Sequence, residues 1–188
     1  MKRTIIILLA SALTAASGPA PLHAQKWSIA TNLLDYANLL TLNAEAGISV
    51  DQHWSLLAEG RYNPFSFRTP GGGLMQNRTL SISAGTRYWP FFVYSGFYYG
   101  GRLQWSRFNT GGILSDCAVE GDAFGLGFNF GYSLMLTEHL NIEFGLGLWF
   151  GAAGYREYAS TVCGKLTGSG IKAFIAPNDI QINLLYNF

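Results

Sequence analysis

The chain has 188 residues, of which 12% are charged, 15% are aromatic and 49% are hydrophobic, and its formal net charge at pH 7 is +1. The charged fraction is about half of that in ordinary soluble proteins. A net charge so near zero excludes nucleic acid as a partner, because proteins that bind it carry a strongly basic surface.

The N-terminal residues have the layout of a secretory signal peptide. Lys2 and Arg3 precede an apolar run over residues 5–16, and a small residue, alanine, stands at position 24. The run is too short to cross a bilayer as a helix, which needs about 20 apolar residues. We therefore expect a signal peptide over residues 1–24 and a single mature domain over residues 25–188.

Eight β-strands are predicted in the mature domain, because large apolar and small or polar residues alternate with the period of two that strands show. They cover residues 27–33, 40–50, 54–62, 77–89, 95–108, 122–136, 140–154 and about 172–188. Leu57 interrupts the alternation. No later stretch resembles a transmembrane helix, and a closed barrel is the other structure that satisfies its backbone within lipid.

The strands at residues 122–136 and 140–154 show two faces of different chemistry. One face is large and apolar, and the other consists mainly of Gly, Asn, Ser and Glu. The apolar set comprises Phe124, Leu126, Phe128, Phe130, Tyr132, Leu134, Leu136, Leu140, Ile142, Phe144, Leu146, Leu148, Phe150 and Ala152. An outer-membrane barrel turns its apolar face to lipid and its small or polar face inward. This arrangement predicts an outer-membrane β-barrel.

The connections between the predicted strands alternate in length. Tight turns near residues 52, 92 and 138 alternate with longer loops near Gly72, Cys117 and Cys163. Bacterial barrels have short periplasmic turns and longer external loops. The fold class is therefore predicted as all-β, an eight-stranded antiparallel up-and-down transmembrane barrel with both termini in the periplasm. The first external loop, at residues 35–39, is short and fits least well.

The last strand has a further feature of outer-membrane proteins. Its apolar face ends at the C-terminal residue and comprises Ile180, Ile182, Leu184, Tyr186 and Phe188. This strand resembles the C-terminal signal that the outer-membrane assembly machinery recognises. We therefore expect that machinery to be a partner of the chain.

Aromatic side chains are expected at both rims of the barrel, where interfacial belts favour them. The set at the periplasmic rim is Trp27, Trp54, Tyr88, Trp89 and Tyr186, and the set at the external rim is Tyr62, Trp105, Phe150 and Tyr155. The alternative is that rings are scattered over an aromatic-rich chain.

Charged residues on the inward face predict a network of ion pairs in the lumen. The set is Glu45, Glu59, Glu143 and Asp179 with Arg61, Arg87 and Arg102. If the turn at residues 51–53 sets the register, Glu45 lies opposite Glu59, so Arg61 or Arg102 is expected to pair with them. An eight-stranded barrel has an interior that side chains can fill. A closed, charge-paired lumen is therefore expected, and a narrow ion or small-solute pore is the alternative.

Two cysteines remain in the mature chain, in different external loops. Cys117 and Cys163 are expected to form a disulfide if the protein is exported. Two free thiols are the alternative.

Catalytic chemistry is not expected, and neither a cofactor nor a metal site is predicted. After the signal peptide only His53 and His139 remain, and both fall in predicted periplasmic turns, away from an external site. The glycines at residues 71–73 have neither the lysine nor the following helix of a phosphate loop. The less favoured alternative is an outer-membrane lipid-modifying enzyme.

Several short motifs resemble those of an uncharacterised Bacteroidota family with a domain-of-unknown-function label. They are the segments at residues 31–34, 42–45, 54–56, 88–90, 125–132 and 141–143, together with the closing strand. Members of that family look like small outer-membrane barrels of the OmpA/OmpX-like kind, and some relatives are associated with fimbrial gene neighbourhoods. The resemblance implies fold and location, and it provides no activity and no site residues.

The expected function is that of an integral outer-membrane protein of the cell envelope with a structural or surface-binding role. Its expected partners are outer-membrane lipid, lipopolysaccharide and the assembly machinery, with an extracellular protein bound by the outer loops as a further possibility.

Overall fold

The computed structural model describes residues 26–68, 73–113, 117–162, 164–177 and 180–188, and the predicted signal peptide lies outside them. An antiparallel sheet of ten strands and one short helix make up the described part. The elements are β1 (Trp27–Asn32), α2 (Leu33–Ala37), β2 (Leu42–Ser49), β3 (Trp54–Asn63), β4 (Ser66–Arg68), β5 (Leu74–Tyr88), β6 (Gly96–Gly111), β7 (Ala118–Met135), β8 (Leu140–Tyr158), β9 (Leu166–Pro177) and β10 (Gln181–Asn187).

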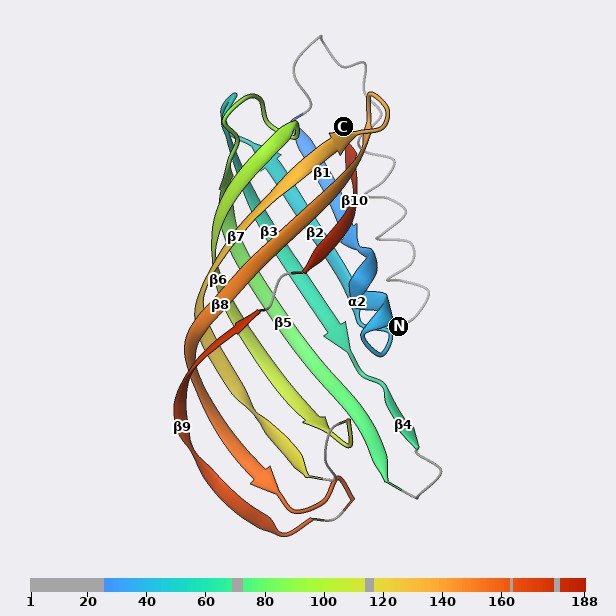
Figure 1. Ribbon diagram of the computed structural model, residues 1–188, viewed down its shortest axis with the longest axis vertical. Helices are drawn as coiled ribbons and strands as arrows, with labels where there is room; N and C mark the ends of the chain where they lie inside the picture. Colours follow the sequence, from blue (N-terminus) through green and yellow to red (C-terminus); the bar gives the residue numbers. More distant parts are fainter. Residues whose placement is uncertain (1–25, 69–72, 114–116, 163, 178–179) are drawn as a thin grey trace, which may run out of the picture.

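Hydrogen bonds join the sheet into a ring. The order is β10–β1–β2–β3–β5–β6–β7–β8, and β8 pairs in turn with β10. Figure 1 shows the strands steeply tilted and winding around a common interior. The prediction of an all-β antiparallel meander is confirmed.

The number of strands differs from the predicted eight in two places. A short strand, β4, lies in the predicted loop and pairs with β5. The predicted last strand is divided into β9 and β10, which pair with different parts of the long strand β8. Pro177 is the last residue of β9, a position that suits proline because it has no N–H to donate to a ladder.

The short connections lie together at one end of the ring, which we call the turn end. Figure 1 shows this end uppermost, and we call the opposite end the loop end. Backbone hydrogen bonds link this end together, from Trp89 N to His53 O at 2.8 Å between two connections and from Asn187 N, in the last residue of β10, to His139 O at 2.8 Å. The two ends of the described chain meet there too, because Lys26 N donates to Phe188 O at 3.1 Å.

Exposure alternates along the strands as the sequence predicts. On β7, Phe128 is 60% exposed on the outer face, whereas its neighbour Asn129 is 7% exposed on the inner face. Leu57 interrupts the alternation of apolar and polar residues in the sequence. Its side chain nevertheless points inward, as its place in the strand requires, and is buried.

Two of the aromatic residues expected at the rims point inward instead. Trp89 is 0% exposed, and its indole N–H donates to Ser55 Oγ at 3.0 Å. It follows the outward Tyr88, and successive residues of a strand face opposite sides, so the two could not share one face. Tyr155 is the cross-strand partner of Gly121 and shares its inward face for the same reason.

A helix replaces the short loop that was expected after the first strand. Asn32 caps α2, because its Oδ1 accepts a hydrogen bond from Leu34 N at 3.1 Å. The same oxygen accepts from Ile182 N on β10 at 3.2 Å. Within the described residues, no helix has the length and apolar character needed to cross a membrane.

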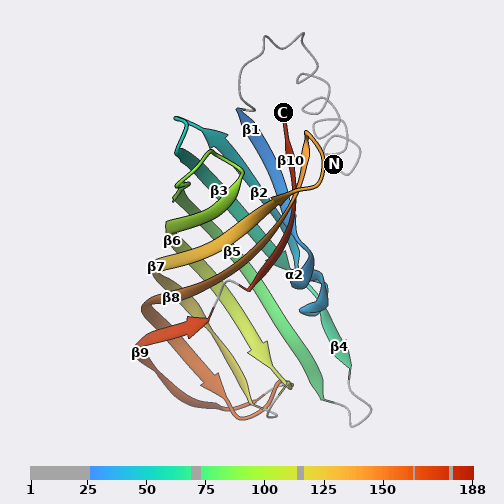
Figure 2. The same cartoon turned by 45° about the horizontal axis from the view of Figure 1, so that its top comes forward.

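The loop-end half of the sheet is not completed into a ring. The strand order ends at β9, which pairs along one edge with β8. On the other side of this break, β1 stops at Asn32 and α2 begins. Figure 2 shows β9 and α2 on opposite sides of this break.

Candidate functional site

The interior in the turn-end half of the ring holds a buried ion cluster centred on Arg87, the penultimate residue of β5. Its guanidinium donates to Glu45 Oε2 at 2.8 Å and to Glu143 Oε2 at 3.2 Å. All three side chains are less than 10% exposed. Two carboxylates from β2 and β8 are therefore joined through one arginine of β5, which ties together distant strands of the ring.

A second ion cluster lies beside the first, towards the loop end. Glu59 accepts from Arg102 Nη1 at 2.8 Å and from Arg61 Nε at 2.6 Å. Arg61 also lies 3.2 Å from Asp35 Oδ2, which links the cluster to α2. Glu45 and Glu59 are cross-strand partners, as the turn at residues 51–53 predicts.

The predicted interior charges that fall in the described residues are thus all inside and all engaged in ion pairs. Arg61 and Arg102 both pair with Glu59, whereas Glu45 is paired by Arg87, an arginine that the sequence did not single out for this role. Asp179 lies outside the described residues.

The remaining predicted site residues lie away from the interior. Cys117 precedes β7 at the loop end and is partly exposed, and Cys163 lies outside the described residues, so the disulfide stays a prediction. The apolar face of the last strand points outward at Ile180, Leu184, Tyr186 and Phe188.

The two histidines lie at the turn end, each beside a backbone carbonyl. His53 Nδ1 is 2.9 Å from Trp89 O, and His139 Nδ1 is 3.1 Å from Asn187 O. The first contact joins two connections and the second joins a connection to the end of β10, so both rings help to hold the turn end together.

An aromatic cluster fills the interior at the turn end. It is formed by Ala30, Trp89, Tyr94, Tyr98 and Leu185. The Arg87 guanidinium carbon lies 4.8 Å from the centroid of the Tyr98 ring, so the cluster borders the first ion cluster. Burial raises the pKa of the Tyr94 hydroxyl above its ordinary value of 10.0, against smaller lowering effects of Ser28 and Arg87.

Between the ion clusters and the loop end, the interior widens into two adjoining cavities. The inner one has a volume of about 230 Å³ and is lined by polar side chains, among them Ser81, Gln104 and Ser106. The outer one has a volume of about 740 Å³, and both are lined by Thr79 and Phe108. Together they form a cup that is closed towards the turn end by the ion clusters.

The wall of the outer cavity follows one level of the sheet. Cross-strand partners run from Asn63 through Thr79, Phe108, Gly121 and Tyr155 to Gly170. The rings of Phe108 and Tyr155 lie beside the two glycines of this row, because an added Cβ would be 3.1 Å from Phe108 at Gly121 and 3.6 Å from Tyr155 at Gly170.

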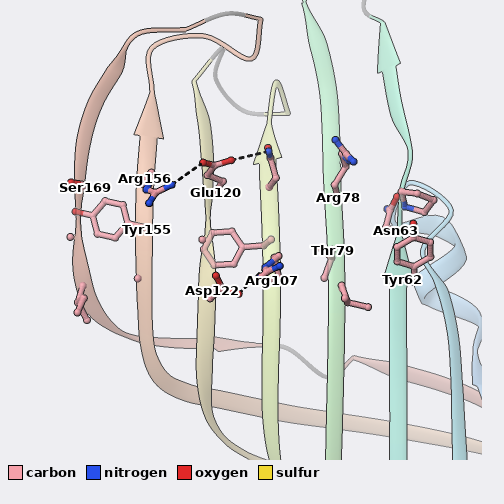
Figure 3. Close-up of a pocket in the computed structure, with 18 residues that line it drawn as sticks. Tyr62, Asn63, Arg78, Thr79, Arg107, Glu120, Asp122, Tyr155, Arg156 and Ser169 are labelled. Carbon is pink, nitrogen blue, oxygen red and sulfur yellow. Dashed lines mark hydrogen bonds and ion pairs between the residues drawn. The ribbon is translucent and has the colours of Figure 1, made fainter.

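Charged side chains surround the cup on the outer face of the same strands. Arg107 Nε lies 3.0 Å from Asp122 Oδ1, and Glu120 accepts from the hydroxyl of Tyr158 at 2.7 Å. Figure 3 shows Glu120 between Arg156 on one side and β6 on the other. These pairs are exposed and lie just above the apolar outer face.

The sequence did not predict the cup. The best sequence signal for it is Trp149, a bulky ring on a face of β8 that carries only Gly, Asn and Glu otherwise between Asn141 and Gly151. Trp149 packs against Phe174 of β9, with the ring centroids 4.5 Å apart. These two residues, with Phe108, Ala123 and Ala153, form an apolar patch inside a largely polar interior.

Comparison with known proteins yields one match. A family model described as "Protein of unknown function (DUF3575)" matches residues 4–188. No curated protein and no solved structure matches the chain.

Proposed function

Because the chain belongs to the DUF3575 family of proteins of unknown function, its role has to be inferred from its own residues, and we propose that it is an integral outer-membrane β-barrel with a sealed lumen and a binding role at the cell surface. Both termini then lie in the periplasm. Outer-membrane lipid and lipopolysaccharide surround the barrel, and the assembly machinery inserts it.

The observation that carries this proposal is the distribution of apolar side chains over the ring. The outer face presents exposed rings and aliphatic chains from nearly every strand, for example Ile29, Ile82, Leu103, Phe128 and Leu146. The inner face buries glutamates, arginines, asparagines and serines. In water this arrangement would expose a large apolar surface and bury charges, whereas in a bilayer it satisfies both faces.

The height of the apolar surface supports the same location. Along β7 and the residue that follows it, this surface runs from Phe124 to Leu136, about 40 Å of extended chain. A tilt near 45° reduces this to a height of about 28 Å, close to the ~25 Å band of outer-membrane barrels. Asp122, on the outer face just beyond Phe124, begins the charged rim.

A sealed lumen is supported by what fills it. The two ion clusters and the aromatic cluster occupy the interior from mid-height to the turn end. Ions would have to pass between paired charges that hold one another within 3.2 Å. We therefore propose binding in the cup, rather than conduction, as the function.

Location and conduction can be tested separately with the full chain. Expressed in a Gram-negative host, the protein should fractionate with the outer membrane and show heat-modifiable mobility on gels. Reconstituted into planar bilayers, the native protein should give near-zero current, and Arg102→Ala should not open a defined channel. A soluble, unmodifiable protein would refute the membrane location, and a steady single-channel current from the native chain would refute the sealed lumen.

A further inference from the structure

The cup has one apolar side and one polar side. The apolar side is formed by Phe108, which lines both cavities, and Trp149, which lines the inner one; both belong to a patch that continues through Ala123, Ala153 and Phe174. The facing side, from α2, β3 and β5, carries side chains such as Asn63, Thr79 and Ser81. A cavity with both kinds of wall suits a molecule that has an apolar part and a polar part.

Lys172 places a positive charge at the edge of this patch. It is the cross-strand partner of Ala153, so it shares the inward face of β9. Its Nζ lies 4.8 Å from the centroid of the Tyr155 ring, which lines the outer cavity. Among the described residues no carboxylate is recorded within ion-pair distance of this ammonium, and its cation–π contact is a weak one. The site therefore favours an anionic group.

Trp149 contributes a second polar feature to the same wall. The residue is 9% exposed, and its indole N–H has no acceptor among the described residues. A buried donor without a partner costs free energy. A ligand that brings an oxygen atom next to this ring would supply the missing acceptor.

Among the described residues β9 pairs with β8 alone, which leaves a route to the cup from the side, past the other edge of β9. The outer face of this edge strand is apolar, with Ile171 83% and Ile175 79% exposed. Ile175 lies level with Phe150 within the apolar outer face, and Ile171 lies level with the charged rim that includes Asp122. Lys172 thus stands at the height where the apolar face meets the rim, which is the level of lipid headgroups if the chain is a membrane barrel.

We propose that the cup binds a single-chain anionic amphiphile, a fatty acid or a lysophospholipid, which enters from the lipid phase past β9. The acidic head contacts Lys172, and the chain lies against Phe174, Trp149 and Phe108. Taken together, the two cavities of about 740 Å³ and 230 Å³ fall within the range of small-molecule sites and leave room for one chain. This inference rests on the membrane location proposed above.

The test uses the full chain reconstituted into lipid vesicles, with dibromostearic acid as probe and its neutral alcohol as the matched control ligand. Bromine quenches tryptophan fluorescence on contact, and the part of the quenching that is lost in Trp149→Phe reports on the cup. We expect saturable Trp149-dependent quenching by both probes. Lys172→Gln should weaken binding of the acid about fivefold, equivalent to ~1 kcal/mol, and leave the alcohol unchanged. Lys165→Gln, outside the cup, should change neither. A brominated lysophospholipid in the same assay should show the same dependence on Lys172.

A cavity-filling variant tests the location of the site independently. A side chain at Gly170 points into the cup, where its first carbon would meet Tyr155 at an ordinary contact distance of 3.6 Å. Gly170→Trp should abolish Trp149-dependent quenching, whereas Gly60→Trp, at an open position on the outer face, should preserve it. Persistent quenching in Gly170→Trp, or an equal effect of Lys172→Gln on acid and alcohol, would overturn the inference.

Vesicle flotation separates the two proposals. Protein that does not float refutes the membrane location and the site with it. Floating protein without Trp149-dependent quenching refutes the site alone.

Discussion

Glu45 and Glu59 lie directly opposite each other on β2 and β3, yet different arginines hold their carboxylates. Arg87 reaches Glu45 from β5, and Arg102 reaches Glu59 from β6. Like charges on opposed positions destabilise a pair of strands. The arginines of the facing strands offset this repulsion, so the stability of β2 and β3 depends on strands far from them in the sequence.

Replacing Arg87 should therefore destabilise the protein strongly. Arg87→Met removes the charge that joins Glu45 and Glu143 and leaves two buried carboxylates facing each other. Breaking a buried ion pair from one side costs about 3–5 kcal/mol. Urea unfolding in lipid vesicles, followed by the heat-modifiable gel shift, measures this loss. Arg107→Met is the matched control, because its pair with Asp122 is exposed and worth less than about 1 kcal/mol. Equal midpoints for the two variants would contradict the importance of the buried cluster.

Asn32 should be important for closing the ring. Its side chain caps α2 and also bonds β10, through Ile182 N at 3.2 Å and Ile180 O at 3.3 Å. Asn32→Ala should cost about 1–2 kcal/mol, the upper range for loss of a helix cap. Hydrogen exchange should be faster at the amides of β10 and unchanged on β7. Asn77→Ala, which removes a single exposed hydrogen bond, is the control. Unchanged exchange on β10 would show that this link is dispensable.

Gly131 should not tolerate a side chain. A methyl group there would collide with the carbonyl oxygen of Phe144 and with the Tyr98 ring. Overpacking of this kind typically costs about 1–3 kcal/mol. Gly131→Ala should lower the urea midpoint, whereas Gly60→Ala, with no atom within 4 Å of the added carbon, should leave it unchanged. Full stability of Gly131→Ala would mean that β7 and β8 can separate to make room for the methyl group.

Ionisation of the Tyr94 hydroxyl should lower the free energy of unfolding at alkaline pH. Burial raises the pKa of its hydroxyl, so the folded chain keeps this proton at a pH where the unfolded chain loses it. The stabilisation is therefore complete below about pH 10 and is lost as the pH rises through the raised folded-state pKa. Unfolding measured above pH 10 should depend less steeply on pH in Tyr94→Phe than in the native chain. Identical slopes would contradict the shift.

Much of the fold follows from the sequence because the period of two is local. Phe128 and Asn129 occupy opposite faces whatever the rest of the chain does, and tight turns fix which residues of neighbouring strands pair. The opposition of Glu45 and Glu59 follows from one such turn. The choice of Arg87 as the partner of Glu45 does not, because β2 and β5 are not neighbours in the sheet.

The sequence by itself determined the antiparallel strands, their faces and the polar interior, since each depends on residues next to one another in the chain. Tertiary structure alone decided that β9 pairs only with β8 in the part of the chain that the structure describes, that α2 ends β1, and that Trp149, Phe174 and Lys172 gather beside a cavity. These features arise where strands of unequal length meet around a ring, and the space left between them depends on distances across the ring that no local pattern encodes.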